Sequence, residues 1–202
     1  MSMMAFTYKT LAEESLAEFS DRGSKFIAYA MPVETQEQMK QALKKCKLLH
    51  PKAVHHCYAF RIGFDNNNYR ASDDGEPSGS AGRPILGQID SAQLSNVLIV
   101  VVRYFGGVLL GVPGLIHAYK TVAQMAIQQN QIIEKKRMQF YKLKFDYTVM
   151  NEVMRILKAH HCEVKTQQQG LFCQMEIGIA LDECEAVMEK IKKLQGVEVD
   201  TA

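Results

Sequence analysis

One run of residues restricts the fold of this chain more than any other. Residues 96–102 (NVLIVVV) are apolar apart from the first, and Arg103, Tyr104 and Phe105 follow directly. A continuous run of aliphatic and β-branched residues is typical of a strand covered on both faces, because a strand with one face in water alternates. The sequence therefore predicts a buried strand that ends at a cation and two aromatic side chains.

The segments around this strand predict a sheet with about three helices. Strand-forming stretches joined by turn residues indicate hairpins, and apolar positions at helical spacing indicate helices. The expected strands are residues 11–19, 25–32, 53–63, 69–72 and 96–102, with turns at 20–23 and 65–68. The expected helices are residues 36–49, a helix from about residue 81, and residues 115–129. In the helix over 36–49, the lysines at 40, 44, 45 and 47 fall outside the apolar positions.

A different unit is predicted from residue 138. Its elements follow the order strand, helix, strand, strand, helix, strand, which is the ferredoxin-like order. They are residues 139–147, 150–160, 163–167, 171–179, 182–194 and 197–200. Residues 134–137 (EKKR) are interpreted as a short charged connection, so we expect two domains of the α+β class, 1–137 and 138–202.

The composition is that of an ordinary globular protein, with 47% hydrophobic and 23% charged residues. The longest apolar stretch is far shorter than the roughly 20 residues of a membrane-spanning helix. The first residues also lack the pattern of a secretory signal, so we expect a cytoplasmic protein. The five cysteines form no CxxC pair, which favours reduced thiols over a zinc site.

Positive charge is concentrated in the first part of the chain. The net charge is only +2, but residues 1–137 contain 16 Lys and Arg against 12 Asp and Glu, whereas the later residues contain 8 against 10. Contacts with phosphate are therefore better sought in the first part.

Four glycines follow the central strand: Gly106, Gly107, Gly111 and Gly114. With the N-terminus of the next helix, their N–H groups could hold a phosphate or another anion. Equally, they could simply permit tight packing between strand and helix while Tyr104 and Phe105 fill the core. Their spacing matches neither GxGxxG nor the Walker loop, so no motif supports a nucleotide pocket.

The acidic segment SDDGEPSGSAG, residues 72–82, places Asp73, Asp74 and Glu76 on one turn. Three carboxylates so close together could bind a metal or act as a general base. We favour the interpretation that they shape the loop, while Ser78 or Ser80 caps the helix that begins near residue 81.

His55, His56 and Cys57 resemble a set of metal ligands, but successive side chains of a strand point to opposite faces, so the three cannot converge. We expect no metal and no cofactor. The chain has no GxSxG sequence and no cysteine in a nucleophile signature, so no catalytic residue is assigned.

Residues 72–82 (SDDGEPSGSAG) and 99–119 (IVVVRYFGGVLLGVPGLIHAY) together resemble bacterial members of the YigZ/IMPACT family. Residues 23–27 (GSKFI) and 55–57 (HHC) match the family in the expected order. The resemblance covers the first domain densely and the second by size and pattern alone.

The resemblance implies a first domain of the ribosomal-protein-S-five second-domain type and a ferredoxin-like second domain, similar to the last two domains of elongation factor G. Ribosomes or structured RNA are therefore the expected partners. Eukaryotic relatives regulate translation by competing for the activator of an initiation-factor kinase, but their second domain differs and their partner is not carried over. The expected binding surface comprises Lys25, His56, Asp73, Asp74, Glu76, Arg83, Arg103, Tyr104, Gly106, Gly107, His117, Tyr119 and Lys120.

One segment departs from the family pattern. Relatives typically have GGL, an apolar residue and then Arg or Lys, whereas residues 113–117 here are PGLIH. A permanent charge is thus replaced by His117, which titrates near pH 6.5. We expect Lys120 to substitute for it in contacts with phosphate.

Three functions are compatible with the sequence. The first is a non-enzymatic regulator of translation that binds ribosomes or structured RNA, with Lys25, Arg83, Arg103 and Lys120 against phosphates and Tyr104 stacking or packing. The second is an enzyme of the small-molecule kinase branch of the same fold, in which the acidic loop holds a metal nucleotide. The third is an adaptor whose RYFGG segment, residues 103–107, binds a protein. We favour the first, and an enzyme is less expected.

Overall fold

The computed structural model describes residues 6–64 and 67–201, which divide into two compact units. The larger unit is Tyr8–Lys135, and the smaller is the chain from Lys136 onward together with the segment up to Thr7. Both mix helices and strands, so the expected α+β class is confirmed. No helix in the described ranges is long and apolar enough to span a membrane.

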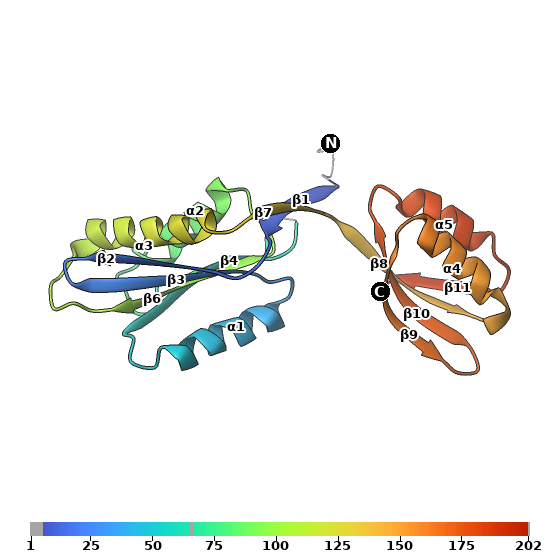
Figure 1. Ribbon diagram of the computed structural model, residues 1–202, viewed down its shortest axis with the longest axis horizontal. Helices are drawn as coiled ribbons and strands as arrows, with labels where there is room; N and C mark the ends of the chain where they lie inside the picture. Colours follow the sequence, from blue (N-terminus) through green and yellow to red (C-terminus); the bar gives the residue numbers. More distant parts are fainter. Residues whose placement is uncertain (1–5, 65–66, 202) are drawn as a thin grey trace. The chain divides into compact units, whose positions relative to one another are not determined.

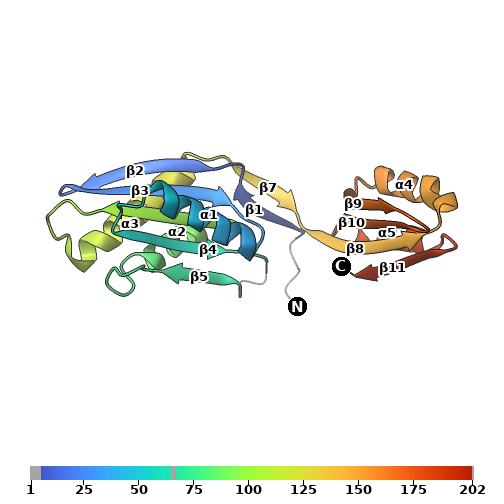
Figure 2. The same ribbon diagram turned by 90° about the horizontal axis from the view of Figure 1, so that it is seen from below.

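The larger unit is built on a five-stranded antiparallel sheet with the strand order β2-β3-β6-β4-β5. The strands are β2 (Ser15–Asp21), β3 (Ser24–Pro32), β4 (His55–Arg61), β5 (Tyr69–Ser72) and β6 (Val97–Tyr104). One face is covered by helix α1 (Gln36–Leu49), and the other by α2 (Gly82–Ser91) and α3 (Gly111–Gln128) (Figure 1). Figure 2 shows α1 in front of the sheet, with α2 and α3 behind it.

The central strand β6 is buried on both faces, as predicted. Val97, Ile99 and Val101 belong to the core beneath α2 and α3, while the alternate residues Leu98, Val100 and Val102 belong to the core beneath α1. Because side chains of a strand alternate between faces, one apolar run supplies both cores.

Helix α1 begins and ends where its sequence favours. Thr35 Oγ1 accepts a hydrogen bond from the Gln38 N–H, and the Gln38 side chain accepts one from the Thr35 N–H. This capping box satisfies two N–H groups that a helix start leaves without partners. The helix ends two residues before Pro51, which matches the prediction.

Three expectations for the larger unit were wrong. Residues 11–19 are not one strand, because β1 (Thr7–Leu11) ends before β2 and pairs with β7 (Ile132–Lys136) in a separate two-stranded sheet. The charged segment 134–137 is therefore mostly strand and not a loop. Helix α3 begins at Gly111 instead of residue 115, since Pro113 in the first turn needs no N–H partner. Residues 65 and 66 of the expected turn lie outside the described residues.

The smaller unit has the ferredoxin-like order that was expected. Its elements are β8 (Met138–Phe145), α4 (Met150–Ala159), β9 (Glu163–Gln169), β10 (Cys173–Ala180), α5 (Cys184–Lys192) and β11 (Val197–Thr201), with a 3-10 turn at Tyr147–Val149. The sheet order is β11-β8-β10-β9, and apolar residues of α4 and α5 pack over its buried face (Figure 1).

Candidate functional site

A buried ion pair holds the end of the central strand. Arg103, near the end of β6, donates from Nη1 to Glu76 Oε1 at 2.6 Å, and their side chains are only 7% and 3% exposed. The guanidinium also lies over the rings of Phe26 and Phe105, 5.5 and 5.7 Å from their centroids. Buried charges are tolerated when they are paired in this way. The expected contact of Arg103 with phosphate would require this pair to open.

Tyr119 and Cys57 extend the pair into the core. The Tyr119 hydroxyl of α3 donates to Glu76 Oε1 at 2.8 Å. The Cys57 thiol lies 3.3 Å from that hydroxyl and 3.0 Å from the Asp73 carbonyl oxygen, so its one proton is donated to either oxygen. Burial raises the pKa of Cys57 to about 12 and raises the pKa of Tyr119 well above its ordinary range. Neither group supplies an anionic nucleophile at neutral pH.

Asp73 caps helix α2. Its carboxylate accepts hydrogen bonds from the N–H groups of Gly79, Ala81 and Gly82 at 2.8, 3.0 and 2.8 Å. Burial alone would raise the pKa of Asp73, but these three backbone donors lower it. The prediction that Ser78 or Ser80 caps this helix was wrong, because the Ser80 hydroxyl donates to the Pro77 carbonyl oxygen and Asp73 accepts from the helix start instead.

Asp74 and the histidines form the border of the site. Asp74 Oδ2 accepts from the His56 N–H at 2.7 Å, and the Asp74 carbonyl oxygen lies 2.7 Å from His55 Nδ1.

His50 lies between two tyrosine hydroxyls, with Nε2 2.6 Å from Tyr29 and Nδ1 2.9 Å from Tyr104. Burial lowers the pKa of His50 and of His56. Among the described residues, no three His, Cys, Asp or Glu side chains are grouped to hold a metal ion.

Gly106 is required by a close contact between backbones. A Cβ atom at this position would lie 1.9 Å from the Gly23 carbonyl carbon, in the turn between β2 and β3. The Gly106 N–H donates to the buried Ser24 hydroxyl at 3.2 Å. This geometry favours the packing interpretation at Gly106. Gly107 has a positive φ of 84°, but a Cβ there would meet open space.

The segment after β6 exposes large apolar side chains, a feature that the sequence reasoning missed. Phe105 was considered for the core, yet it is 48% exposed, and Leu109 is 81% exposed. Together with Val108, Val112 and Ile116, these residues form what we call the apolar loop surface. The sequence signal for this surface was an apolar run interrupted by glycines. The apolar side chains of such a run cannot all be buried beneath one helix.

The remaining predicted residues lie at the surface of three elements. Lys25 of β3 pairs with Glu18 at 2.8 Å, and the His117 ring of α3 meets the Phe19 ring edge-on. Arg83 of α2 and Lys120 of α3 are exposed. The structure therefore joins Glu76, Arg103 and Tyr119 by direct contacts. Asp73, Asp74 and His56 lie beside this network. The basic side chains of residues 25, 83, 117 and 120 lie outside it.

Comparison with known proteins assigns the chain to a class of two-unit α+β proteins. A crystal structure described only as a hypothetical protein matches 98% of this chain and 98% of its own, with 25% identity and a TM-score of 0.78. The model of the Impact N-terminal domain family matches residues 22–127. The chain belongs to the IMPACT family, as the resemblance indicated.

Two bacterial members show how far the similarity extends. IMPACT family member YvyE of Bacillus subtilis is 34% identical over 155 residues, which cover 77% of this chain and 71% of that protein. IMPACT family member YigZ of Escherichia coli is 35% identical over 136 residues, covering 66% and 67%.

Proposed function

We propose that this protein is a non-enzymatic regulator of translation that binds ribosomes or structured RNA in the cytoplasm. The observation that carries the proposal is that the chemically reactive side chains of the site are buried and hydrogen-bonded to one another. Glu76 is occupied by Arg103 and Tyr119, and Cys57 is a neutral thiol. Such a network supports a surface and supplies no free nucleophile or base.

Membership of the IMPACT family supports the link with translation, since the motif resembles that of translation regulators and the order of the units resembles that of elongation factor G. Exposed basic side chains of the larger unit support a polyanionic partner, because contacts with phosphate supply most of the affinity for nucleic acid. The exposed lysines of helix α1 are such side chains, whereas Arg103 is buried and acts by holding the end of β6 in place.

Co-sedimentation tests this function. The purified full chain is centrifuged with ribosomes and with isolated subunits at low salt, and without ribosomes as the control. We expect the protein to pellet when ribosomes or one of the isolated subunits are present, and to stay in the supernatant without them. A protein that stays in the supernatant at low salt with all three would contradict the proposal.

A nucleotide-binding enzyme is the alternative that thermal unfolding tests directly. A ligand at 100 times its dissociation constant stabilises the folded state by about 2.7 kcal/mol. We expect no shift of the unfolding temperature with ATP or GTP and magnesium. A concentration-dependent rise would support the kinase-like function instead.

A protein-binding adaptor is a second candidate, favoured by the apolar loop surface. Contiguous exposed apolar side chains are typical of surfaces that bind protein. In this case, association with ribosomes would survive nuclease treatment and be lost in the Val108→Ser/Leu109→Ser variant. Loss of association on nuclease treatment, with the variant still binding, would exclude the adaptor.

A further inference from the structure

We propose that the outward face of α1, carrying Lys40, Lys44 and Lys47, binds the phosphate backbone of structured RNA. This inference rests on the proposed function and names the surface that performs it. It differs from the expected surface, whose central cation, Arg103, is buried and paired.

The three lysines form one stripe along the helix. Residues at i, i+4 and i+7 share a helix face, and all three side chains are exposed. A different face of α1 is buried through Met39 and Cys46. The stripe is therefore held in place by packing while its ammonium groups remain in water.

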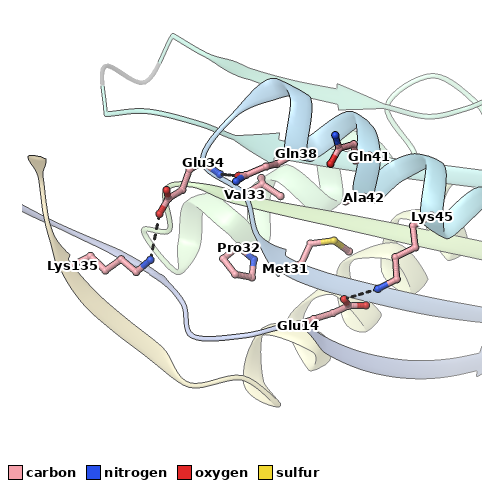
Figure 3. Close-up of a pocket in the computed structure, with 10 residues that line it drawn as sticks. All are labelled: Glu14, Met31, Pro32, Val33, Glu34, Gln38, Gln41, Ala42, Lys45 and Lys135. Carbon is pink, nitrogen blue, oxygen red and sulfur yellow. Dashed lines mark hydrogen bonds and ion pairs between the residues drawn. The ribbon is translucent and has the colours of Figure 1, made fainter. Parts of the chain in front are cut away.

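This stripe has no carboxylate partner in the part of the chain that the structure describes. Among the described residues, none of the three lysines has a carboxylate within ion-pair distance, and the acidic residue of the helix itself is Glu37 in the first turn. Lys45 differs, since it pairs with Glu14 at 3.1 Å across a groove of about 570 Å³ beside α1. Figure 3 shows that pair at one end of the groove and the pair of Lys135 with Glu34 at the other. The groove side of the helix is thus balanced, and the stripe is not.

The segment around this helix also contains all the excess positive charge of the first part of the chain. Residues 36–52 include five lysines and one glutamate, whereas the rest of residues 1–137 has 11 basic and 11 acidic residues. A polyanion that approaches the first part is therefore attracted to α1 before any other element.

The length of the stripe fits a nucleic acid strand. Seven residues of helix span about 10 Å. Over that length of axis, one strand of a duplex presents about three phosphates. Three lysines can therefore meet three successive phosphates without distortion of the helix.

Two variants with the same change of charge test the proposal. One is Lys40→Gln/Lys44→Gln/Lys47→Gln, and the other is Lys25→Gln/Arg83→Gln/Lys120→Gln, which removes the basic residues expected from the sequence. Binding of each full chain to labelled transfer RNA is measured by fluorescence anisotropy from 50 to 200 mM salt. Circular dichroism confirms that both variants are folded.

We expect the α1 variant to lose most of its affinity at low salt and to reduce the salt slope of log K by about 3, while the second variant stays near wild type. Loss in the second variant alone would overturn the assignment to α1 and leave the proposed function intact. Equal losses would also overturn it, since they would show a response to net charge only. Absence of binding by the wild type would overturn the assignment of structured RNA to α1, while co-sedimentation with ribosomes decides the proposed function separately.

Discussion

At the residue scale, the buried ion pair between Arg103 and Glu76 shows whether these side chains contact a partner or stabilise the fold. Removing one partner of a buried ion pair leaves the other charge uncompensated, which typically costs about 3–5 kcal/mol. We therefore predict that Arg103→Met lowers the free energy of unfolding in urea by about that amount. Glu76→Gln combined with Arg103→Met should cost less than the sum of the single changes. A single variant as stable as the wild type would show that the pair is not structural.

Gly106 and Gly107 are adjacent but should respond differently to alanine. In Gly106→Ala the new Cβ would overlap the backbone of Gly23, so one strand end must move, at about 3 kcal/mol or more. In Gly107→Ala the Cβ has room, and the positive φ alone costs about 1–2 kcal/mol. Urea unfolding of the two variants measures the difference, and the reverse order of stability would contradict the structure.

His50 and His56 predict a pH dependence of stability. Burial lowers the pKa of both in the folded protein, so below pH 6.5 the unfolded chain binds protons that the folded chain resists. Their contribution is present above pH 6.5 and is lost as the pH falls through the lowered values. We expect the free energy of unfolding to decrease from pH 7 to pH 5 in the wild type and to change less in His50→Gln/His56→Gln. Equal pH profiles would refute this assignment.

The sequence singled out Glu76, Arg103 and Tyr119 as a group but did not show that they are buried. Alternation along β6 places Arg103 on the same face as Val101, beneath α2 and α3. Whether that face is still covered at the end of the strand depends on Glu76 and Tyr119, which come from elsewhere in the chain. A motif read along the sequence cannot show this tertiary contact.

At the element scale, α2 depends on a carboxylate that lies outside it. Asp73→Ala removes the acceptor for three N–H groups, and we predict a loss of about 1–2 kcal/mol in urea unfolding. Glu14→Ala, which removes an exposed ion pair with Lys45, is the control and should cost less than about 1 kcal/mol. Similar losses in both variants would indicate that Asp73 is not the cap.

Elements defined by local patterns were predicted well, and those defined by distant partners were not. Helix α1, strand β6 and the order of the smaller unit follow from periodicity and turn residues. Strand β1 pairs with β7, more than a hundred residues later, and nothing within residues 7–11 indicates that partner. The cap of α2 was assigned to Ser78 or Ser80 for the same reason, because nothing in the local pattern shows that the Asp73 carboxylate lies against the N–H groups of residues 79, 81 and 82.

At the scale of the whole molecule, the chain combines two α+β units with a positive charge excess confined to one helix and the residues that follow it. Under the proposed function, the buried network around Glu76 stabilises the larger unit and α1 is the surface for RNA, while the exposed apolar loop surface is a second candidate contact. A regulator that binds ribosomes can use both surfaces, since ribosomes present protein and RNA together.

Site-specific photo-crosslinking tests this account most directly. A photoreactive residue replaces Glu37, in the first turn of α1, and in a control protein replaces Glu152, in the first turn of α4. Each full chain is irradiated with ribosomes and then treated with nuclease. We predict nuclease-sensitive cross-links from position 37 and none from position 152. Equal yields from both positions, cross-links to ribosomal protein alone, or no cross-link from either would contradict binding of RNA through α1.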